Sequence, residues 1–236
     1  MKAQSKTGIW DKEWASTVLL EASRSTRLYS TRDVQQRLKD THGQAGMEQV
    51  SYLAKSGILG PVYVSGGSTS FESTLVDKLL DRPSYTLTDL DGLASLSEVD
   101  GALILRQLPL TVVDDPEVED RPFFGTHARL FDLDRQDDRR RALDEATRKF
   151  WRIAPSRRSS IWKHIAEHGF CPLIVTIGKW CLGGRNIKAL HEVESGPYAG
   201  RVCFDIGDAS DWAHDVTHTW IDPGSGASAV WWTRNK

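Results

Sequence analysis

The stretch that most directly indicates the fold is GALILRQLPL, residues 101–110. Its run of consecutive apolar residues, Ala102 to Leu105, is bounded by turn residues, and such a run is typical of a strand buried on both faces. The stretch PLIVTIGKW, residues 172–180, has the same character and predicts another strand. We therefore expect both stretches in the core of the protein.

Three short helices and a strand are expected ahead of this core. Residues 14–19 and 47–59 carry apolar side chains at helical spacing, and Gly57 is placed to end the second of these helices. Between them, Ser30 or Thr31 can cap a helix that has Asp33 in its first turn. Residues 60–66, GPVYVSG, then predict a strand.

This order of elements over residues 8–66 resembles the winged-helix variant of the helix-turn-helix domain. The resemblance implies that the third helix reads nucleic acid. That helix offers only a weakly basic set of side chains, namely Glu48, Gln49, Tyr52 and Lys55. A helical unit that packs on its neighbour or binds a protein is therefore an equal alternative.

Residues 61–112 indicate a small α/β segment of alternating strands and helices. The turn Gly66–Ser70 is expected between a strand and a helix, where backbone amides can bind an anion. It lacks the lysine and the spacing of a P-loop, so an ordinary tight connection is the favoured interpretation.

The acidic stretch VVDDPEVEDRP, residues 112–122, predicts a domain boundary, and residues 121–236 form the expected C-terminal domain. This domain has basic helices separated at Pro155 and a tryptophan-rich hairpin in which DPGSGA joins THTWI to SAVWWTR. The expected fold class is α+β, with a winged-helix-like N-terminal unit, a small α/β segment, and C-terminal helices packed on a mostly antiparallel sheet.

The composition is that of a globular protein, with 39% hydrophobic and 26% charged residues among 236. The three cysteines are odd in number and lack C-x-x-C spacing, which favours reduced thiols over a disulfide framework. No apolar run approaches the roughly 20 residues that span a bilayer. The N-terminal residues also lack the apolar core of a signal peptide. We expect a cytoplasmic protein that does not enter a membrane.

The net charge of −2 conceals a basic stretch, because residues 135–164 hold ten Lys or Arg and four acidic residues. Cations and aromatic rings alternate there, which suits a single strand or RNA, since arginine binds phosphate and an exposed ring stacks on a base. A solvated helix face with a core of Phe150 and Trp151 is the alternative. The predicted nucleic-acid-binding residues are Arg139, Arg140, Arg141, Arg148, Lys149, Trp151, Arg152, Arg157, Arg158, Trp162 and Lys163.

The motif H-x-x-E-H occurs once, as His164, Glu167 and His168. On a helix the two histidines lie one turn apart and can reach one ion, while the glutamate can polarise a bound water. These three residues are the candidate catalytic group. A helix end, where the dipole favours a histidine, is the competing interpretation.

A further pair, His214 and His218, has the same spacing. If the segment is helical, all four histidines could contribute to one divalent metal site. If it is a strand, the two histidines lie about 13 Å apart and cannot share an ion.

Three functions follow from these patterns. The leading hypothesis is nucleic-acid binding, with a single strand or RNA favoured over duplex, by a free protein or a subunit of a larger assembly. The alternative is a metal-dependent hydrolase or nuclease that uses the H-x-x-E-H helix. A non-catalytic module that binds protein partners through the tryptophan-rich hairpin is the third, and it predicts an exposed apolar patch at Trp212, Trp220, Trp231 and Trp232.

Overall fold

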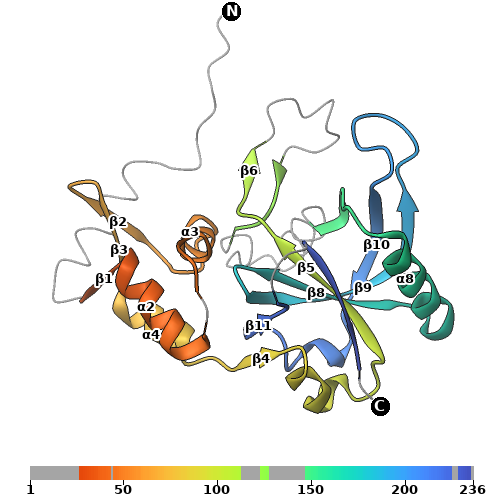
Figure 1. The fold of residues 1–236 in the computed structure, drawn as a ribbon, viewed down its shortest axis with the longest axis horizontal. Coiled ribbons are helices and arrows are strands. Elements are labelled where there is room, and N and C mark those ends of the chain that lie inside the picture. Colours follow the sequence, from red (N-terminus) through yellow and green to blue (C-terminus); the bar gives the residue numbers. More distant parts are fainter. Residues whose placement is uncertain (1–26, 44, 113–122, 128–146, 225–227, 235–236) are drawn as a thin grey trace, which may run out of the picture.

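The computed structural model describes residues 27–43, 45–112, 123–127, 147–224 and 228–234. The fold is α+β, as expected, with helices packed on mostly antiparallel sheets. In the view of Figure 1, a small helical unit lies to the left of the central strands and helix α8 lies to their right. None of the helices in the described ranges is long and apolar enough to cross a membrane. The expected first helix, at residues 14–19, and nearly all of the expected domain boundary fall outside these ranges.

The described part of the N-terminal unit combines three helices with a small antiparallel sheet. Its three-stranded sheet has the order β1-β3-β2, and both pairings are antiparallel. The elements are β1 (Leu28–Ser30), α2 (Thr31–His42), α3 (Met47–Lys55), β2 (Val62–Ser65), β3 (Ser68–Glu72) and α4 (Ser73–Leu80). Val34 and Leu38 of α2 and Val50 and Leu53 of α3 are buried, so the apolar faces read from the sequence form the core of this unit.

Helix α2 begins with a reciprocal cap. The Ser30 hydroxyl accepts the backbone N–H of Asp33 at 3.2 Å, and the Asp33 carboxylate accepts the backbone N–H of Ser30 at 2.8 Å. Two N–H groups that the helix itself cannot satisfy are thereby paired. The hydrogen bonds from Ser30 also hold the pKa of Asp33 below its usual value.

The turn at Gly66 does not join a strand to a helix, which corrects the expectation for this stretch. Gly66 and Gly67 have φ of 56° and 78° and connect β2 to β3 as a hairpin, and the helix begins later, at Ser73. Paired positive φ angles match the twist of antiparallel strands and suit Gly-Gly. The expected α/β segment is consequently divided, since β2 and β3 belong to the N-terminal sheet while the next strands join the larger one.

The larger sheet has seven strands. Six follow the order β12-β5-β8-β9-β11-β4, and β10 pairs with β9. The pairs β5–β8 and β11–β4 are parallel and the others are antiparallel. The strands are β4 (Ser84–Thr86), β5 (Gly101–Gln107), β8 (Cys171–Ile177), β9 (Trp180–Glu192), β10 (Val202–Asp208), β11 (Trp220–Asp222) and β12 (Ala229–Thr233).

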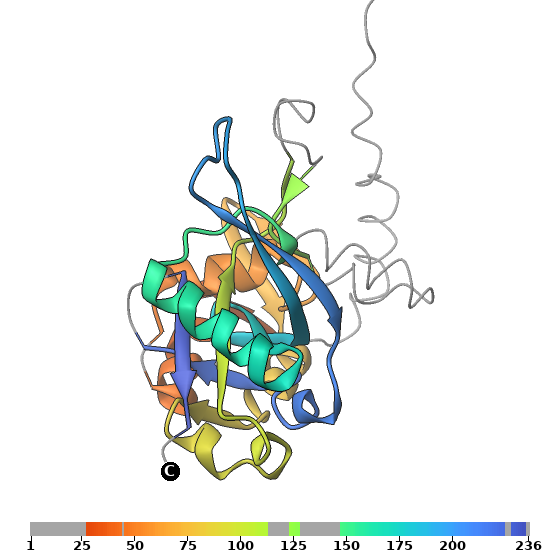
Figure 2. The same cartoon turned by 90° about the vertical axis from the view of Figure 1, so that its right-hand side faces the viewer.

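Both faces of this sheet are covered. Leu103, Leu105, Leu173 and Val175 pack with the N-terminal helices and with Ile161 of α8 (Pro155–His168). The residues that point to the other face pack beneath the short turns η1 (Asp89–Gly92), η2 (Ala94–Leu96) and η3 (Asp211–Ala213). The remaining pair, β6 (Thr111–Val112) and β7 (Phe123–Phe124), forms a separate ribbon. Figure 2 shows α8 lying across the strands.

The tryptophan-rich hairpin is not present. Strand β11 pairs with β4 and β9, whereas β12 pairs with β5 at the opposite edge of the sheet. The expected exposed patch is also wrong, because Trp212, Trp220 and Trp232 are at most 4% exposed and Trp231 is half-buried. These indoles are core side chains, so they do not form the predicted partner surface.

Strand β9 is the longest strand of the described residues, and it was not predicted from the sequence. It contains Gly183 and Gly184, which ordinarily argue against a strand interior. A Cβ at Gly184 would lie 2.6 Å from the Cβ of Ala213 and 2.6 Å from the Trp212 ring. The glycine is required because η3 packs directly on the strand.

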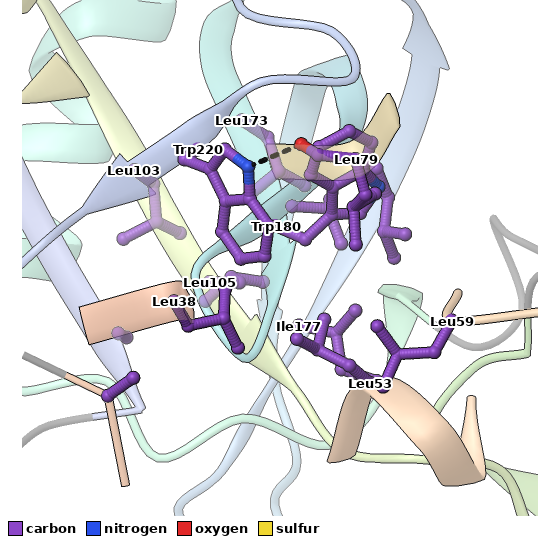
Figure 3. Close-up of a cluster of buried hydrophobic side chains, with 14 of the residues drawn as sticks. Leu38, Leu53, Leu59, Leu79, Leu103, Leu105, Leu173, Ile177, Trp180 and Trp220 are labelled. Atoms are coloured by element: carbon purple, nitrogen blue, oxygen red, sulfur yellow. Dashed lines mark hydrogen bonds between the residues drawn. The ribbon is translucent and has the colours of Figure 1, made fainter. Parts of the chain in front are cut away.

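Trp220 connects the N-terminal unit to the large sheet. Its indole N–H donates to the carbonyl of Leu79, in α4, at 2.9 Å, and its backbone N–H donates to that of Pro83 at 2.8 Å (Figure 3). The ring centroid lies 4.7 Å from that of His42 and 5.2 Å from that of Trp180. Because the side chain is only 1% exposed, α2, α4, β9 and β11 meet around one indole.

Replacing this indole tests how much the junction contributes to stability. We expect Trp220→Phe to lower the free energy of unfolding by about 1–3 kcal/mol, because the Leu79 carbonyl loses its indole donor in a buried site. The measurement is the midpoint of urea unfolding, followed by circular dichroism. Trp162→Phe is the matched control, since Trp162 is 48% exposed on α8. Equal midpoints for the two variants would contradict a structural role for the Trp220 hydrogen bond.

The same junction predicts a loss of stability in mild acid. Burial lowers the pKa of His42 and of His218, and Lys179 and Arg82 act in the same direction on the respective histidines. The unfolded chain, with histidine pKa values near 6.5, therefore binds more protons in acid, so the free energy of unfolding falls as pH decreases through about 6.5.

We expect a lower Tm at pH 5.5 than at pH 7.5, and a smaller difference in the double variant His42→Gln, His218→Asn. Asparagine is chosen because His218 has φ of 58°, a conformation that asparagine tolerates. His214→Gln is the control, since the His214 side chain is 89% exposed. An unchanged pH dependence in the double variant would assign the effect to other groups.

Candidate nucleotide-binding pocket

A pocket of about 730 Å³ lies where the N-terminal unit meets the large sheet. Strands β5 and β8 are parallel neighbours, and both end at this pocket, β5 with Arg106 and Gln107 and β8 just before Gly178 and Lys179. The carboxyl ends of parallel strands are a recurrent location for ligand sites in α/β sheets. The pocket therefore has both the size and the position of a small-molecule site.

Helix α3 forms one wall of the pocket through Glu48, Gln49 and Tyr52. The Gln49 side-chain amide donates to the carbonyl of Gly178 at 2.7 Å, which fixes the helix against the β8–β9 turn. The Tyr52 hydroxyl donates to the Glu48 carboxylate at 2.6 Å, and this hydrogen bond raises the pKa of Tyr52. The polar face of α3 is thus directed at the large sheet.

A second wall of the pocket is a stack of aromatic and cationic groups. The rings of Phe150 and Tyr198 are 4.4 Å apart and nearly parallel, at 12°. The Arg201 guanidinium lies 4.7 Å from the centre of the Tyr198 ring, and the Lys149 ammonium lies 5.6 Å from that of Phe150. Alternation of cations and ring faces is favourable in its own right and also presents positive charge beside a stacking surface.

Backbone hydrogen bonds hold this wall in place. Trp151 and Val202 exchange N–H···O bonds of 2.9 and 3.0 Å, which joins the segment carrying Lys149 and Phe150 to β10. The β9–β10 loop that carries Tyr198 and Arg201 is closed by two bonds of 2.8 Å, from Val193 N–H to the Arg201 carbonyl and from Gly200 N–H to the Val193 carbonyl.

The described lining is strongly cationic. It contains Arg106, Lys149, Lys179 and Arg201, with Glu48 as its one carboxylate. Lys179 also forms an ion pair of 2.7 Å with Asp222. Burial alone would raise the pKa of Asp222, but the hydrogen bonds from Lys179 and from Gly224 N–H hold it below its usual value. Asp222 therefore stays ionised and orients the Lys179 ammonium at the pocket edge.

The predicted nucleic-acid-binding residues separate into groups in the structure. Lys149 and Trp151 line the pocket. Arg157 donates to the carbonyl of Ala229, and Arg158 donates to those of Ile153 and Gly200 and pairs with Glu192 at 2.8 Å, so both bind the protein itself. Arg152, Trp162 and Lys163 are exposed, and Arg148 is half-buried. Arg139, Arg140 and Arg141 lie outside the described residues.

Five residues of the stack and of the cationic lining were not among the predicted site residues, namely Arg106, Phe150, Lys179, Tyr198 and Arg201. A signal for two of them existed, because Arg106 and Lys179 stand at the carboxyl ends of the two strongest apolar runs. What the sequence could not show is that these runs are parallel neighbours, which brings their ends together. Tyr198 and Arg201 lie in a polar loop and carried no comparable signal.

The H-x-x-E-H residues lie on α8 as expected, and Pro155 and Gly169 bound the helix. The His164 Nδ1–H donates to the carbonyl of Phe170 at 2.9 Å, its Nε2 is buried without a partner, and its ring centroid lies 4.4 Å from that of His168. Glu167 instead faces Lys163, with 3.8 Å between Glu167 Oε1 and Lys163 Nζ. The catalytic role of the three residues stays a prediction.

The second histidine pair does not complete a metal site. His214 is exposed beside Asp215, while His218 stacks on Trp180 with 6.2 Å between ring centres. In the described ranges, no three His, Cys, Asp or Glu side chains are grouped so that they could hold a metal ion. The possible arrangement in which all four histidines hold one divalent ion is therefore not seen among the described residues, since the turn at η3 packs through Trp212 and Val216 on a different face of the sheet from Ile161 of α8.

No protein-family model, curated protein or solved structure matches this chain. Its function must therefore be inferred from the geometry of the pocket. That geometry contains positive charge, ring faces and main-chain groups at the ends of parallel strands, which together suit an anionic ligand with an aromatic part.

The cysteines are expected to take no part in nucleophilic chemistry at this pocket. None of the three cysteines, which all lie in the described ranges, forms a disulfide, and burial raises the pKa of Cys171 and of Cys181 to about 12. We expect iodoacetamide at pH 8 to alkylate the partly exposed Cys203 alone in the native protein, and all three after unfolding. Mass spectrometry of the intact chain and its peptides gives the readout. Rapid native labelling of Cys171 or Cys181 would show that the strands open readily.

Proposed function

We propose that this chain binds nucleic acid and prefers a single strand or RNA to duplex DNA. The observation that carries the proposal is the Phe150–Tyr198 stack, flanked by Lys149 and Arg201 in a cationic pocket. A base can take the place of one of these cations against a ring, and the displaced cation can then neutralise the phosphate that accompanies the base.

The placement of α3 argues for a single strand over duplex. In a winged helix, duplex DNA is read by the equivalent helix, whose side chains must enter the major groove. Here Gln49 is bound to Gly178, and Tyr52 is bound to Glu48 beside the same pocket. Reading of a duplex by α3 would have to break these hydrogen bonds and separate the helix from the sheet.

The proposal predicts that the pocket cations control both affinity and salt dependence. We expect the double variant Lys149→Ala, Arg201→Ala to weaken binding of a fluorescent single-stranded RNA. The logarithm of the association constant falls as the logarithm of the salt concentration rises. The magnitude of this slope should decrease by roughly 0.7 for each phosphate that the protein no longer neutralises. Fluorescence anisotropy at several salt concentrations measures both quantities.

The matched control removes the same charge elsewhere. Arg152→Ala with Lys163→Ala also deletes two cations, from exposed positions that do not line the pocket. We expect this control to bind nearly as tightly as the unmodified chain, because screened surface charges contribute little at physiological salt. If both double variants lose affinity equally, binding is diffuse and the pocket is not its site. If the unmodified chain binds no strand, the proposed function is wrong.

A further inference from the structure

The size of the pocket limits how much of a strand it can hold. Proteins that follow a single strand contact roughly 4–16 nucleotides per binding domain along an open groove. The volume here, about 730 Å³, lies within the range of small-ligand sites, roughly 300–1,000 Å³. One nucleotide, or at most two, fits such a space, so the pocket is not a track for a continuous strand.

The charge of the pocket exceeds what an internal nucleotide needs. Each internal phosphodiester carries one negative charge, whereas a phosphomonoester carries about −1.5 to −2 at neutral pH and offers three acceptor oxygens. Arg106, Lys149, Lys179 and Arg201 line this one cavity, and Glu48 together with Asp222, the partner of Lys179, offsets two of these four positive charges. The charge that the described residues leave over matches a terminal or free phosphate better than a single phosphodiester.

The walls are also built to hold a single ligand firmly. Gln49 fixes α3 to Gly178 on one side, and Arg158 fixes the β9–β10 loop on the other through Gly200 and Glu192. A preformed pocket loses less conformational entropy on binding than a mobile loop would, and the affinity of a small ligand depends on that difference.

We propose that this pocket binds one nucleoside phosphate through its phosphomonoester group, either at the end of a strand or as a free nucleotide. The base takes the place of one cation against the Phe150–Tyr198 pair, and the phosphate binds that cation together with the others around the pocket. This inference rests on the proposed function, because it concerns the same site, but it specifies the end of a strand as the feature recognised.

The test compares ligands that differ only at their ends. The full chain is titrated, by calorimetry, with a six-nucleotide RNA carrying a 5′-phosphate, a 3′-phosphate or hydroxyls only, with a circular single strand, and with free nucleoside monophosphates. We expect a strand with one of the terminal phosphates to bind at least about tenfold more tightly than the hydroxyl and circular forms, because the phosphate forms charge-assisted hydrogen bonds. The expected stoichiometry is one ligand per chain.

Two substitutions examine the two parts of the ligand separately. Lys149→Ala should abolish the preference for a terminal phosphate, while Tyr198→Leu should weaken all ligands that carry a base and spare binding of inorganic phosphate. Arg152→Ala is the control for charge and Trp162→Leu is the control for aromatic character, since both side chains are exposed outside the pocket. Thermal unfolding of each variant confirms that it is folded.

The outcomes separate this inference from the function on which it rests. Equal affinity for circular and phosphorylated strands, with several nucleotides per site, would overturn the inference and leave nucleic-acid binding intact. Binding of free nucleoside monophosphates without binding of any strand would support the inference and overturn the proposed function. Absence of binding by every ligand would overturn both.

Discussion

The contact of Trp220 with Leu79 fixes the arrangement on which the other features depend. A three-helix unit and a seven-stranded sheet could pack in many ways through apolar surface alone, because hydrophobic burial is not directional. The indole N–H at 2.9 Å from the Leu79 carbonyl, with His42 against the ring, selects one of these packings. A buried donor without its acceptor would be more costly than a slightly poorer apolar fit, so the hydrogen bond specifies the orientation.

The pocket follows from that orientation. Once α4 and α2 are fixed around Trp220, α3 reaches the β8–β9 turn, where Gln49 binds Gly178. Gly178 has φ of 52°, and a Cβ there would lie 3.2 Å from the Gln49 carbonyl oxygen, so the turn allows this close approach only with glycine. The polar face of the helix and the ends of β5 and β8 then enclose a space with positive charge. The polar face of α3 thereby becomes one wall of the pocket.

The sequence predicted the elements whose causes are local. The cap at Ser30 and Asp33 and the boundary of a helix at Pro155 depend on residues within a few positions, and both agree with the structure. The apolar runs of β5 and β8 were recognisable for the same reason. Strand β9 was missed because its glycines argue against a strand. The reason for a glycine at position 184 is the close packing of Trp212, which lies 28 positions further along the chain. Strand β12 likewise pairs with β5 and not with β11, and this pairing joins residues more than a hundred positions apart in the sequence.

The candidate site was harder to predict because the sequence does not show whether a cationic side chain lines a pocket or binds the protein's own backbone. Arg157 and Arg158 are in the basic stretch that indicated phosphate binding, yet their guanidinium groups bind backbone carbonyls of Ala229, Ile153 and Gly200. Arg201 was not predicted as a site residue, yet it lines the pocket. Arg158 still affects the site, because it fixes the loop that presents Arg201. In this fold the basic stretch supplies both a cation that lines the pocket, Lys149, and the Arg158 hydrogen bond that holds the loop of the same wall, and only the tertiary contacts separate these two roles.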